Sequence, residues 1–375
     1  MRAAVYLDPP THHLRGNRIF EPEGNPYAGD DILAPYVAVR DRLVEAGFPV
    51  RTADLIPDRP DGRRHFVVSF GAADRLVSHT MRRYRALSRR DDVVLSAFFA
   101  MECPVVEPRM FKALPGLEGL FRRIFSWSDS EALLPFTRSP VRTRHFAWPQ
   151  SFDDVDERLW RREPRRFLLM MNANKLPRLY HRELYTERLR AVEYFHRHGE
   201  IDLYGRNWDR APTRVGKTAT PFALRRVASA AWEARQRVWP DALYTAAAGA
   251  SRGPTPSKSE TVSRYRFALC FENSELKGWI TEKIFDCFHV GTIPIYRGAP
   301  DILDWVPAEC FIDMRRFCDF DDLRAYLHAM PPAEERRLRS CARDYVASAR
   351  FDPFRRAAFA DIVASVVMAD AGDQA

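Results

Sequence analysis

The stretch FALCFENSELKGWITEKIFDCFHVGTIPIYRG, residues 267–298, predicts one strand–helix–strand unit of a parallel sheet. A polar loop separates the first apolar strand from a helix that Thr281 can cap and that Gly291 ends. Ile284 and Phe288 share one face of this helix, which can cover the sheet. Because two parallel strands need such a crossover helix, the stretch indicates an α/β fold. The three elements are expected at residues 267–272, 281–290 and 292–298.

The same alternation of strands and helices occurs earlier in the chain. Short apolar runs predict strands at residues 2–7, 49–54, 65–70, 92–99, 167–174 and 201–205. Helices are expected over residues 34–46 and 183–198, each followed by a glycine. The second of these helices has an apolar stripe that includes Tyr185, Leu189 and Val192. Such a stripe can cover one face of a parallel sheet.

A chain of 375 residues is too long for one ordinary core, so two domains are expected. The polar stretch 147–165 is the best candidate for a linker. We therefore predict a first domain over residues 1–155, a second domain over 156–345 and a C-terminal helical tail over 346–375. Residues 209–256, with a helical centre at FALRRVASAAWEARQRV, are interpreted as an insertion or lid. Two such domains usually leave a cleft in which ligands bind.

Composition narrows the function classes. No apolar run approaches the roughly 18 to 20 residues of a membrane span, and the N-terminus lacks the pattern of a signal peptide, so a soluble, untargeted chain is expected. Six cysteines without a CxxC pair favour a reducing compartment over a disulfide framework. The net charge of +8 is compatible with a protein that binds RNA or an anionic surface. However, the arginine pairs have acids close by, which favours a solvated surface.

Lysine is rare in this chain, and its positions are informative. Six lysines stand beside 52 arginines, and five of the six lie between residues 175 and 283. Lys283 falls in the first turn of a predicted helix, where the partial positive charge of the helix disfavours a cation unless an anion compensates it. A diphosphate would supply that anion, and the neighbouring Glu282 could accept hydrogen bonds from ribose hydroxyls. An exposed Glu–Lys pair on a surface helix would give the same pattern.

Other phosphate and metal signatures are weak. The chain contains neither GxxxxGK[ST] nor GxGxxG, which argues against a kinase or a dinucleotide enzyme. Two DxD triplets, at residues 154–156 and 319–321, could hold a divalent metal against a sugar nucleotide. Among 50 acidic residues such pairs are expected by chance, so we predict no metal site.

The run YRFALCFENSELKGWITEKIFDCFHVGTIPIYRGAPDI, residues 265–302, resembles the signature of the α1,3/α1,4-fucosyltransferase family. The resemblance implies an inverting enzyme that uses GDP-fucose and has two Rossmann-like domains facing a cleft, the GT-B architecture. Supporting segments lie in both halves of the chain, at residues 17–27, 98–108, 124–127, 172–195 and 201–208.

The resemblance also implies site residues. The donor site falls on Arg206, Lys258, Asn273, Trp279, Thr281, Glu282 and Lys283. Trp279 stands where the family usually has tyrosine, so it can stack on the donor but cannot reproduce a hydroxyl contact. The general base falls on Glu102 of Met101–Pro104, where Cys103 replaces the family's serine. Alternatively, the Glu102 carboxylate could cap the turn before Pro104.

The resemblance further implies the partners of the chain. GDP-fucose is the expected donor, and no cofactor or divalent metal is expected. The acceptor is expected to be a glycan of the N-acetylglucosamine or N-acetyllactosamine type, or a lipopolysaccharide precursor. The chain resembles the bacterial branch, which works in the cytoplasm, with at most peripheral membrane contact at its inner face. A GT-B transferase for another GDP-deoxyhexose is the first alternative, and the RNA- or surface-binding protein is the second.

Overall fold

The chain forms two compact units. The structure, a computed structural model, describes residues 3–21, 29–71, 77–214 and 222–372. Four of the segments singled out above extend beyond the described residues, namely 2–7, 17–27, 209–256 and 346–375. Unit 1 contains the described residues up to Asp153 and those from Asp352 onward, and unit 2 contains the described residues between Asp154 and Phe351.

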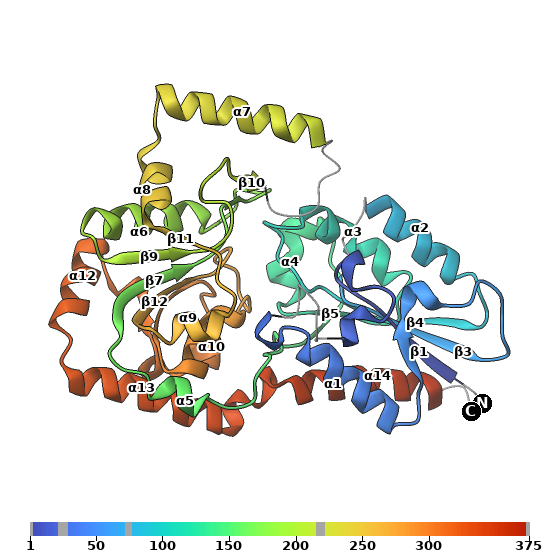
Figure 1. The fold of residues 1–375 in the computed structure, drawn as a ribbon. Helices are drawn as coiled ribbons and strands as arrows, with labels where there is room; N and C mark the ends of the chain where they lie inside the picture. The colour runs from blue at the N-terminus through green and yellow to red at the C-terminus, as the bar shows by residue number, and fades with distance from the viewer. Residues whose placement is uncertain (1–2, 22–28, 72–76, 215–221, 373–375) are drawn as a thin grey trace. The chain divides into compact units, whose positions relative to one another are not determined.

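Unit 1 is built on a parallel sheet with the strand order β2-β1-β3-β4-β5-β6 in the described part (Figure 1). Its strands are β1 (Ala3–Asp8), β2 (Val50–Thr52), β3 (Arg64–Ser69), β4 (Val93–Phe99), β5 (Ile124–Ser126) and β6 (Thr143–His145). Its helices are α1 (Ala34–Glu45), α2 (Val77–Leu87), α3 (Pro108–Glu118), α4 (Ser130–Thr137) and α14 (Arg356–Gly372). The order reverses between β1 and β3, as in doubly wound folds.

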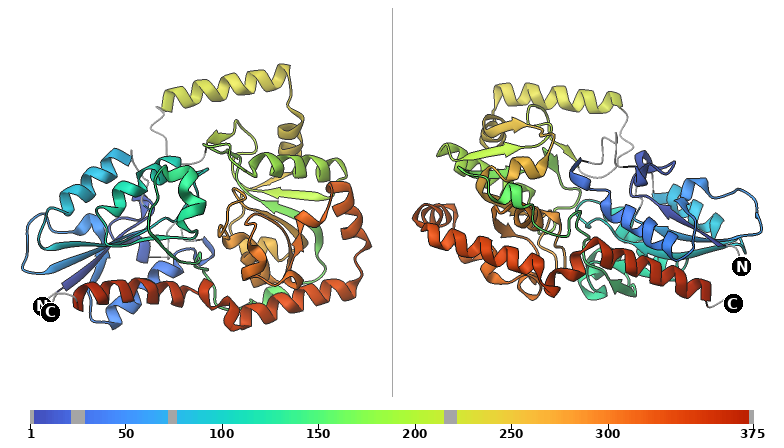
Figure 2. Two further views of the ribbon diagram at one scale, coloured as in Figure 1. Left: turned by 180° about the vertical axis from the view of Figure 1, so that it is seen from behind. Right: turned by 60° about the horizontal axis from the view of Figure 1, so that its bottom comes forward.

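The C-terminal helix α14 is a structural part of unit 1. It packs against α1, and the two helices lie side by side in Figures 1 and 2. Its Phe359 ring contacts the rings of Phe70, Phe99 and Phe146. Further along the helix, the buried carboxylate of Asp370 accepts hydrogen bonds from Arg122 and Arg123 at 2.8 and 2.7 Å. The segment predicted as a tail therefore contributes to the core of this unit.

Unit 2 has a second parallel sheet, with the described strand order β11-β9-β7-β12-β13-β14. The strands are β7 (Arg166–Met171), β9 (Ile201–Tyr204), β11 (Ser251–Gly253), β12 (Tyr265–Phe271), β13 (Ile293–Arg297) and β14 (Ile312–Asp313), and a separate pair is formed by β8 (Lys175–Leu176) and β10 (Thr213–Arg214). The helices are α5 (Glu157–Trp160), α6 (Tyr185–Arg197), α7 (Phe222–Val238), α8 (Ala242–Ala250), α9 (Lys258–Val262), α10 (Glu282–Val290), α11 (Ile302–Trp305), α12 (Phe320–Ala329) and α13 (Pro332–Ala347).

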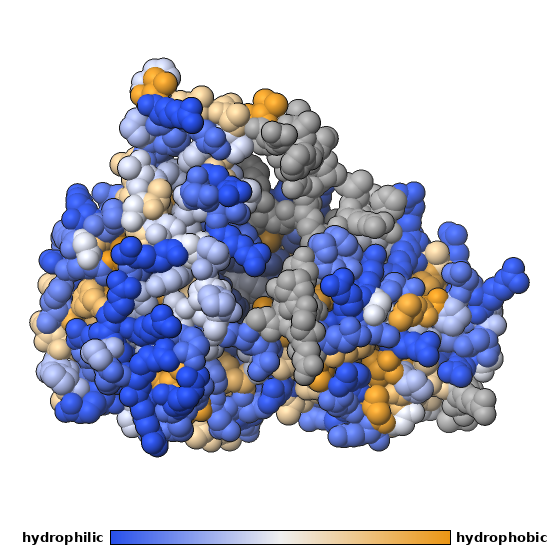
Figure 3. Space-filling model, in the orientation of Figure 1, coloured by the Kyte–Doolittle hydropathy of each residue, from blue (hydrophilic) through white to orange (hydrophobic). Residues whose placement is uncertain are grey.

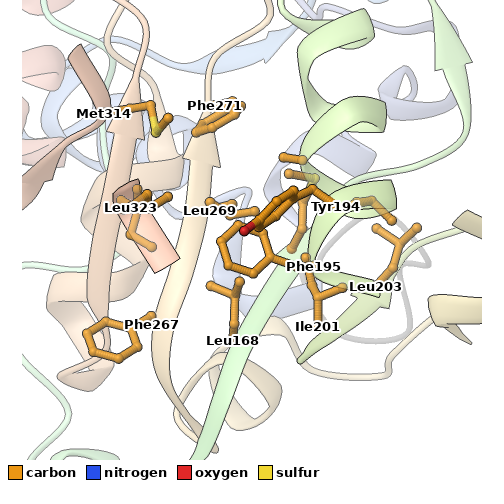
Figure 4. Close-up of a cluster of buried hydrophobic side chains, with 14 of the residues drawn as sticks. Leu168, Tyr194, Phe195, Ile201, Leu203, Phe267, Leu269, Phe271, Met314 and Leu323 are labelled. Carbon is orange, nitrogen blue, oxygen red and sulfur yellow. The ribbon is translucent and has the colours of Figure 1, made fainter. Parts of the chain in front are cut away.

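Helices cover both faces of the second sheet (Figure 2). On one face, Leu168 and Leu269 pack with Phe195 of α6 in the main apolar core of the unit (Figure 4). Residues at the alternate strand positions point to the other face, where α9 and α10 lie. The strand order changes direction between β7 and β12. In open α/β sheets, ligands bind beyond the carboxyl ends of the strands at such a switch point.

The predicted fold class is confirmed. Both units are doubly wound parallel α/β sheets, as expected for Rossmann-like domains. The strands and helices predicted from apolar periodicity all occur, with bounds shifted by a few residues, and the predicted helical centre of residues 222–238 is α7. Gly291 ends α10 in the left-handed conformation, with φ 71°. The three-residue strands β5 and β6 were not predicted, because they are too short to show a periodicity.

The basic surface is balanced locally by acids. Each arginine pair noted in the sequence contains at least one member in an ion pair: Arg90 with Asp92 at 2.6 Å, Arg162 with Glu260 at 2.6 Å, and Arg337 with Glu334 at 2.8 Å. Hydrophilic side chains cover most of the face seen in Figure 3. None of the helices in the described part of the chain has the length and hydropathy that a membrane crossing needs. All six cysteines are free thiols.

Candidate functional site

A cavity lies at the switch point of the second sheet. It is lined by the ends of β7 and β12, by the first turns of α10 and by side chains from α6 and α9. Its charged lining residues are Arg188, Lys258, Glu282, Lys283 and Asp286. Three cations and two carboxylates therefore surround one cavity inside unit 2, at the position where this fold binds ligands.

Lys283 is held at the cavity by a buried carboxylate that follows β12. The Lys283 ammonium donates hydrogen bonds of 2.8 Å to Glu272 Oε2 and to Thr281 Oγ1. Glu272 is fully buried and also accepts from the backbone N–H and the hydroxyl of Thr281. Gly298 makes room for it, because a Cβ at that position would lie 2.5 Å from Glu272 Cγ.

These contacts fix the charge and direction of Lys283. Burial lowers the pKa of the ammonium, but Glu272 and Glu282 raise it, and the net pKa lies above the ordinary value. An ammonium has three donors, and two of them are used by Glu272 and Thr281. The Glu282 carboxylate is 3.7 Å away, outside hydrogen-bond distance. Within the described part of the chain, one Lys283 donor therefore has no hydrogen-bond acceptor, and the side chain is 21% exposed.

Thr281 occupies the N-cap position, as predicted, but its side chain does not cap the helix. Its hydroxyl contacts Glu272 instead. The N-terminal amides of α10 thus receive no hydrogen bond from their N-cap side chain.

A second ion pair lies on the next turn of α10. The Lys258 ammonium donates to Asp286 Oδ2 at 2.6 Å. Burial lowers the pKa of Lys258, whereas Asp286 and Glu282 raise it, with a net rise. Burial also raises the pKa of Asp286, and Lys258 offsets only part of that effect. Lys258 therefore stays charged beside Asp286.

Arg188 of α6 also lines the cavity, next to the end of β12. Its guanidinium donates to the backbone carbonyl of Phe271 at 3.1 and 2.6 Å and to Asn273 Oδ1 at 3.0 Å. It also lies 4.8 Å from the ring centre of Tyr185. Asn273 is thus brought to the site as a partner of Arg188, not as a lining residue of the cavity.

The remaining donor residues implied by the resemblance lie outside the cavity lining. Arg206 follows β9 and is exposed, and its side chain has no hydrogen bond or ion pair with any other described residue. Trp279 is only 2% exposed, in the loop between β12 and α10. Asn172, at the end of β7, does line the cavity, and its Oδ1 is a buried acceptor without a hydrogen bond to described residues.

Glu102 belongs to unit 1, after β4. Its Oε1 accepts the backbone N–H of Cys103 at 3.0 Å, and its carbonyl accepts the indole N–H of Trp127 at 3.2 Å. The side chain is half-buried. The carboxylate thus makes the turn contact that the sequence suggested as an alternative role.

Both DxD triplets contain helix caps. Asp156 caps α5 through Leu159 N, and Asp319 caps α12 through Asp322 N, at 3.0 and 2.9 Å. Asp321 accepts a hydrogen bond from the Tyr194 hydroxyl. These three carboxylates therefore have structural partners within unit 2.

Residues 237–340 match the family model described as "Glycosyltransferase family 10 (fucosyltransferase) C-term". The matched range contains β12 and α10, and with them Lys258, Glu282 and Lys283.

Curated proteins show the same likeness over short stretches. An α-(1,3)-fucosyltransferase of Helicobacter pylori is 41% identical over 75 residues, which are 19% of this chain and 16% of that protein. An α-(1,4)-fucosyltransferase of Arabidopsis thaliana is 38% identical over 66 residues, 18% of this chain and 16% of that protein. A GDP-fucose protein O-fucosyltransferase 3 of Xenopus laevis is 39% identical over 67 residues, 18% and 14% of the two chains.

Each match thus spans less than a fifth of the relative's length. Over the whole chain, the structure is similar to a crystal structure of an α1,3-fucosyltransferase at a TM-score of 0.47, with 14% identity and coverage of 97% and 91%. The likeness to fucosyltransferase sequences is thus found in segments of the chain, among them residues 237–340.

The charges around Glu282 predict that the stability of the fold depends on pH in the acid range. Burial alone raises the pKa of Glu282, but the charges of Lys283 and Lys258 outweigh it and lower the pKa from 4.5 to about 2. Since the folded pKa is depressed, this carboxylate stabilises the fold above pH 4.5, and the contribution is lost as the pH falls toward 2. We expect the stability difference between wild type and Glu282→Gln to shrink over this range, in urea titrations at pH steps. A constant difference would contradict the ion-pair network.

Sequence reasoning missed three charged residues that lie at this cavity or pair with its lysines. Glu272, Asp286 and Arg188 were not singled out, although the first two are the partners of the predicted lysines. Glu272 had a signal, since it is a charged residue at the end of an apolar strand. Arg188 interrupts the otherwise apolar side of α6 and is 5% exposed. Asp286 looked like an ordinary residue on the polar side of its helix.

Proposed function

We propose that this protein is a fucosyltransferase that transfers L-fucose from GDP-fucose to a hydroxyl group of an acceptor glycan, with inversion at the anomeric carbon. The observation that carries the proposal is that the segment matching the family 10 model contains Lys258, Glu282 and Lys283 around one cavity at a switch point. The names of the relatives, which include α1,3- and α1,4-fucosyltransferases and a GDP-fucose protein O-fucosyltransferase, support the donor.

The diphosphate of the donor would bind at the N-terminus of α10. There the free Lys283 donor and the backbone N–H groups of the first turn favour an anion. Glu282 would accept hydrogen bonds from ribose hydroxyls, and Asn172 Oδ1 could accept one from a ligand N–H or O–H. Arg206, an exposed arginine at a strand end, would add a cation at the phosphate. Trp279 is too buried to stack on a donor without a rearrangement of its loop.

The reaction follows from these roles. Glu102 accepts the proton of an acceptor hydroxyl as its oxygen attacks the anomeric carbon of fucose. The bond between that carbon and the phosphate oxygen breaks, and GDP leaves with the electron pair. Negative charge grows on the diphosphate in the transition state, so cations fixed beforehand are worth more there than in the ground state. Lys283 is held by Glu272 and Thr281 before the ligand arrives, which meets this requirement.

A comparison of nucleotides tests the donor. We expect GDP to raise the melting temperature, and UDP, ADP and CDP at the same concentration to raise it much less. GDP at about 100 times its Kd adds about 2.7 kcal/mol to the free energy of unfolding. We further propose that no divalent metal is needed, so a chelator should leave the GDP shift unchanged.

The same experiment can overturn the proposal. A larger melting-temperature shift with UDP than with GDP would contradict GDP-fucose as the donor. A GDP shift that disappears with chelator would contradict the proposal that no divalent metal is needed. GDP-fucose in competition with other GDP-deoxyhexoses then separates fucose transfer from its first alternative.

A further inference from the structure

A buried arginine at the cavity, Arg188, has no counter-ion among the residues that the structure describes. Arg188 is 5% exposed and lines the cavity. Its hydrogen-bond acceptors among the described residues are neutral: the Phe271 carbonyl and the Asn273 amide oxygen. No carboxylate of the described residues lies within ion-pair distance of it. A buried charge without an ionic partner is costly unless a partner arrives.

The guanidinium of Arg188 has N–H donors that the described residues do not use. A guanidinium carries five N–H donors, and the protein bonds of Arg188 use Nε and Nη2. Nη1 therefore keeps two donors without an acceptor in the described part of the chain. The Arg188 charge is close enough to Lys283 to oppose its ammonium and lower the pKa of that lysine. Two cations with unused donors thus line one cavity.

We propose that Arg188 is a phosphate-binding residue of the donor site, in addition to the residues that the family resemblance implies. Nη1 donates to a terminal phosphate oxygen of the nucleoside diphosphate, while Nε and Nη2 keep α6 attached to the end of β12. This inference rests on the proposed function for the identity of the nucleotide, but the anion site itself does not depend on it.

The bonds to Phe271 and Asn273 serve the phosphate contact. They leave the guanidinium plane little freedom, so few side-chain conformations are lost when the anion binds. Arginine is suited to this task because its fork can bond the protein with one edge and a phosphate with another. A lysine at position 188 could supply the charge but not both sets of bonds.

The test compares ligands with and without phosphate. Kd values for GDP, guanosine and inorganic pyrophosphate are measured by calorimetry for wild type, Arg188→Gln and Arg188→Lys. We expect Arg188→Gln to raise the Kd for GDP and for pyrophosphate by about 10- to 100-fold, the usual contribution of a hydrogen bond to a charged group. The Kd for guanosine should stay within about twofold of wild type. Arg190→Gln removes an exposed arginine of the same helix, which pairs with Glu187, and should change nothing.

The ligand pattern separates binding from folding. If Arg188 only supports the fold, its loss should lower the affinities for guanosine and for GDP by the same factor. That result would overturn the inference. Arg188→Lys keeps an aliphatic stem and the charge, so the affinities for GDP and guanosine can be compared in this variant if Arg188→Gln does not fold. We expect a loss of about tenfold or less for this variant, again confined to the phosphate ligands.

The same binding measurements test the proposed function separately from the role of Arg188. If wild type binds pyrophosphate through Arg188 but shows no preference for GDP over the other nucleotides, the anion site is supported and the guanine-nucleotide proposal is wrong. If wild type binds GDP and Arg188→Gln leaves the ratio of GDP to guanosine affinity unchanged, the proposed function is supported and the role of Arg188 is wrong. Wild type that binds neither GDP nor pyrophosphate ends both.

Discussion

Glu102→Gln should abolish most of the transferase activity while nucleotide binding survives. We expect kcat to fall by about 10²- to 10⁴-fold, the usual contribution of a general base, and the Kd for GDP to stay within about twofold of wild type. The amide has nearly the shape of the carboxylate but cannot accept the proton of the acceptor hydroxyl. Its oxygen can still accept the N–H of Cys103, so the turn before Pro104 is preserved.

The measurement is the initial rate at saturating donor and acceptor, with GDP affinity determined on the same preparations. Glu131→Gln, at an exposed glutamate of unit 1, is the matched control and should keep the wild-type rate. Retention of wild-type turnover by Glu102→Gln would remove this residue as the base. A parallel loss of GDP affinity would mean that the change acts on the fold and not on proton transfer.

Most of the strands and helices of the fold could be predicted from local sequence patterns. The stretch 267–298 alternates a buried strand, a helix with one apolar face and a second buried strand, and the structure has β12, α10 and β13 in these places. Short-range periodicity is sufficient there, because each element is long enough to display it. The packing of α14 into unit 1 could not be predicted in this way. Its Phe359 contacts Phe70, Phe99 and Phe146, which lie more than 200 positions earlier in the chain, and no local pattern encodes such a contact.

The site was predictable where its residues are neighbours in the chain. Glu282 and Lys283 stand together at a helix start, so the need for a nearby anion could be argued from the helix dipole alone. The anion that the protein itself supplies was not foreseen: Glu272 lies eleven positions earlier and reaches Lys283 only because the loop between β12 and α10 folds back. Arg188 comes from a different strand–helix unit, and its role depends on which strand end it meets. Tertiary structure decides both.

Removal of Lys283 tests this arrangement most directly. Lys283→Met is expected to lower the free energy of unfolding by about 3–5 kcal/mol, the usual cost when one partner of a buried ion pair is removed. Glu272 then remains fully buried with only the Thr281 N–H and hydroxyl as donors. We also expect kcat/KM to fall by at least about tenfold, since one preorganised donor to the leaving group is worth roughly 3–4 kcal/mol. Urea titration measures the first effect and steady-state kinetics the second.

A double variant separates the two consequences. In Lys283→Met/Glu272→Gln neither charge is present, and the glutamine oxygen can still accept from Thr281. Since replacing both partners of a buried pair is often close to neutral, most of the lost stability should return. Activity should remain as low as in the single variant, because the cation that faces the diphosphate is still missing. If activity returned together with stability, Lys283 would be a structural residue whose charge the reaction does not need, and the leaving-group role would pass to the other cations of the site.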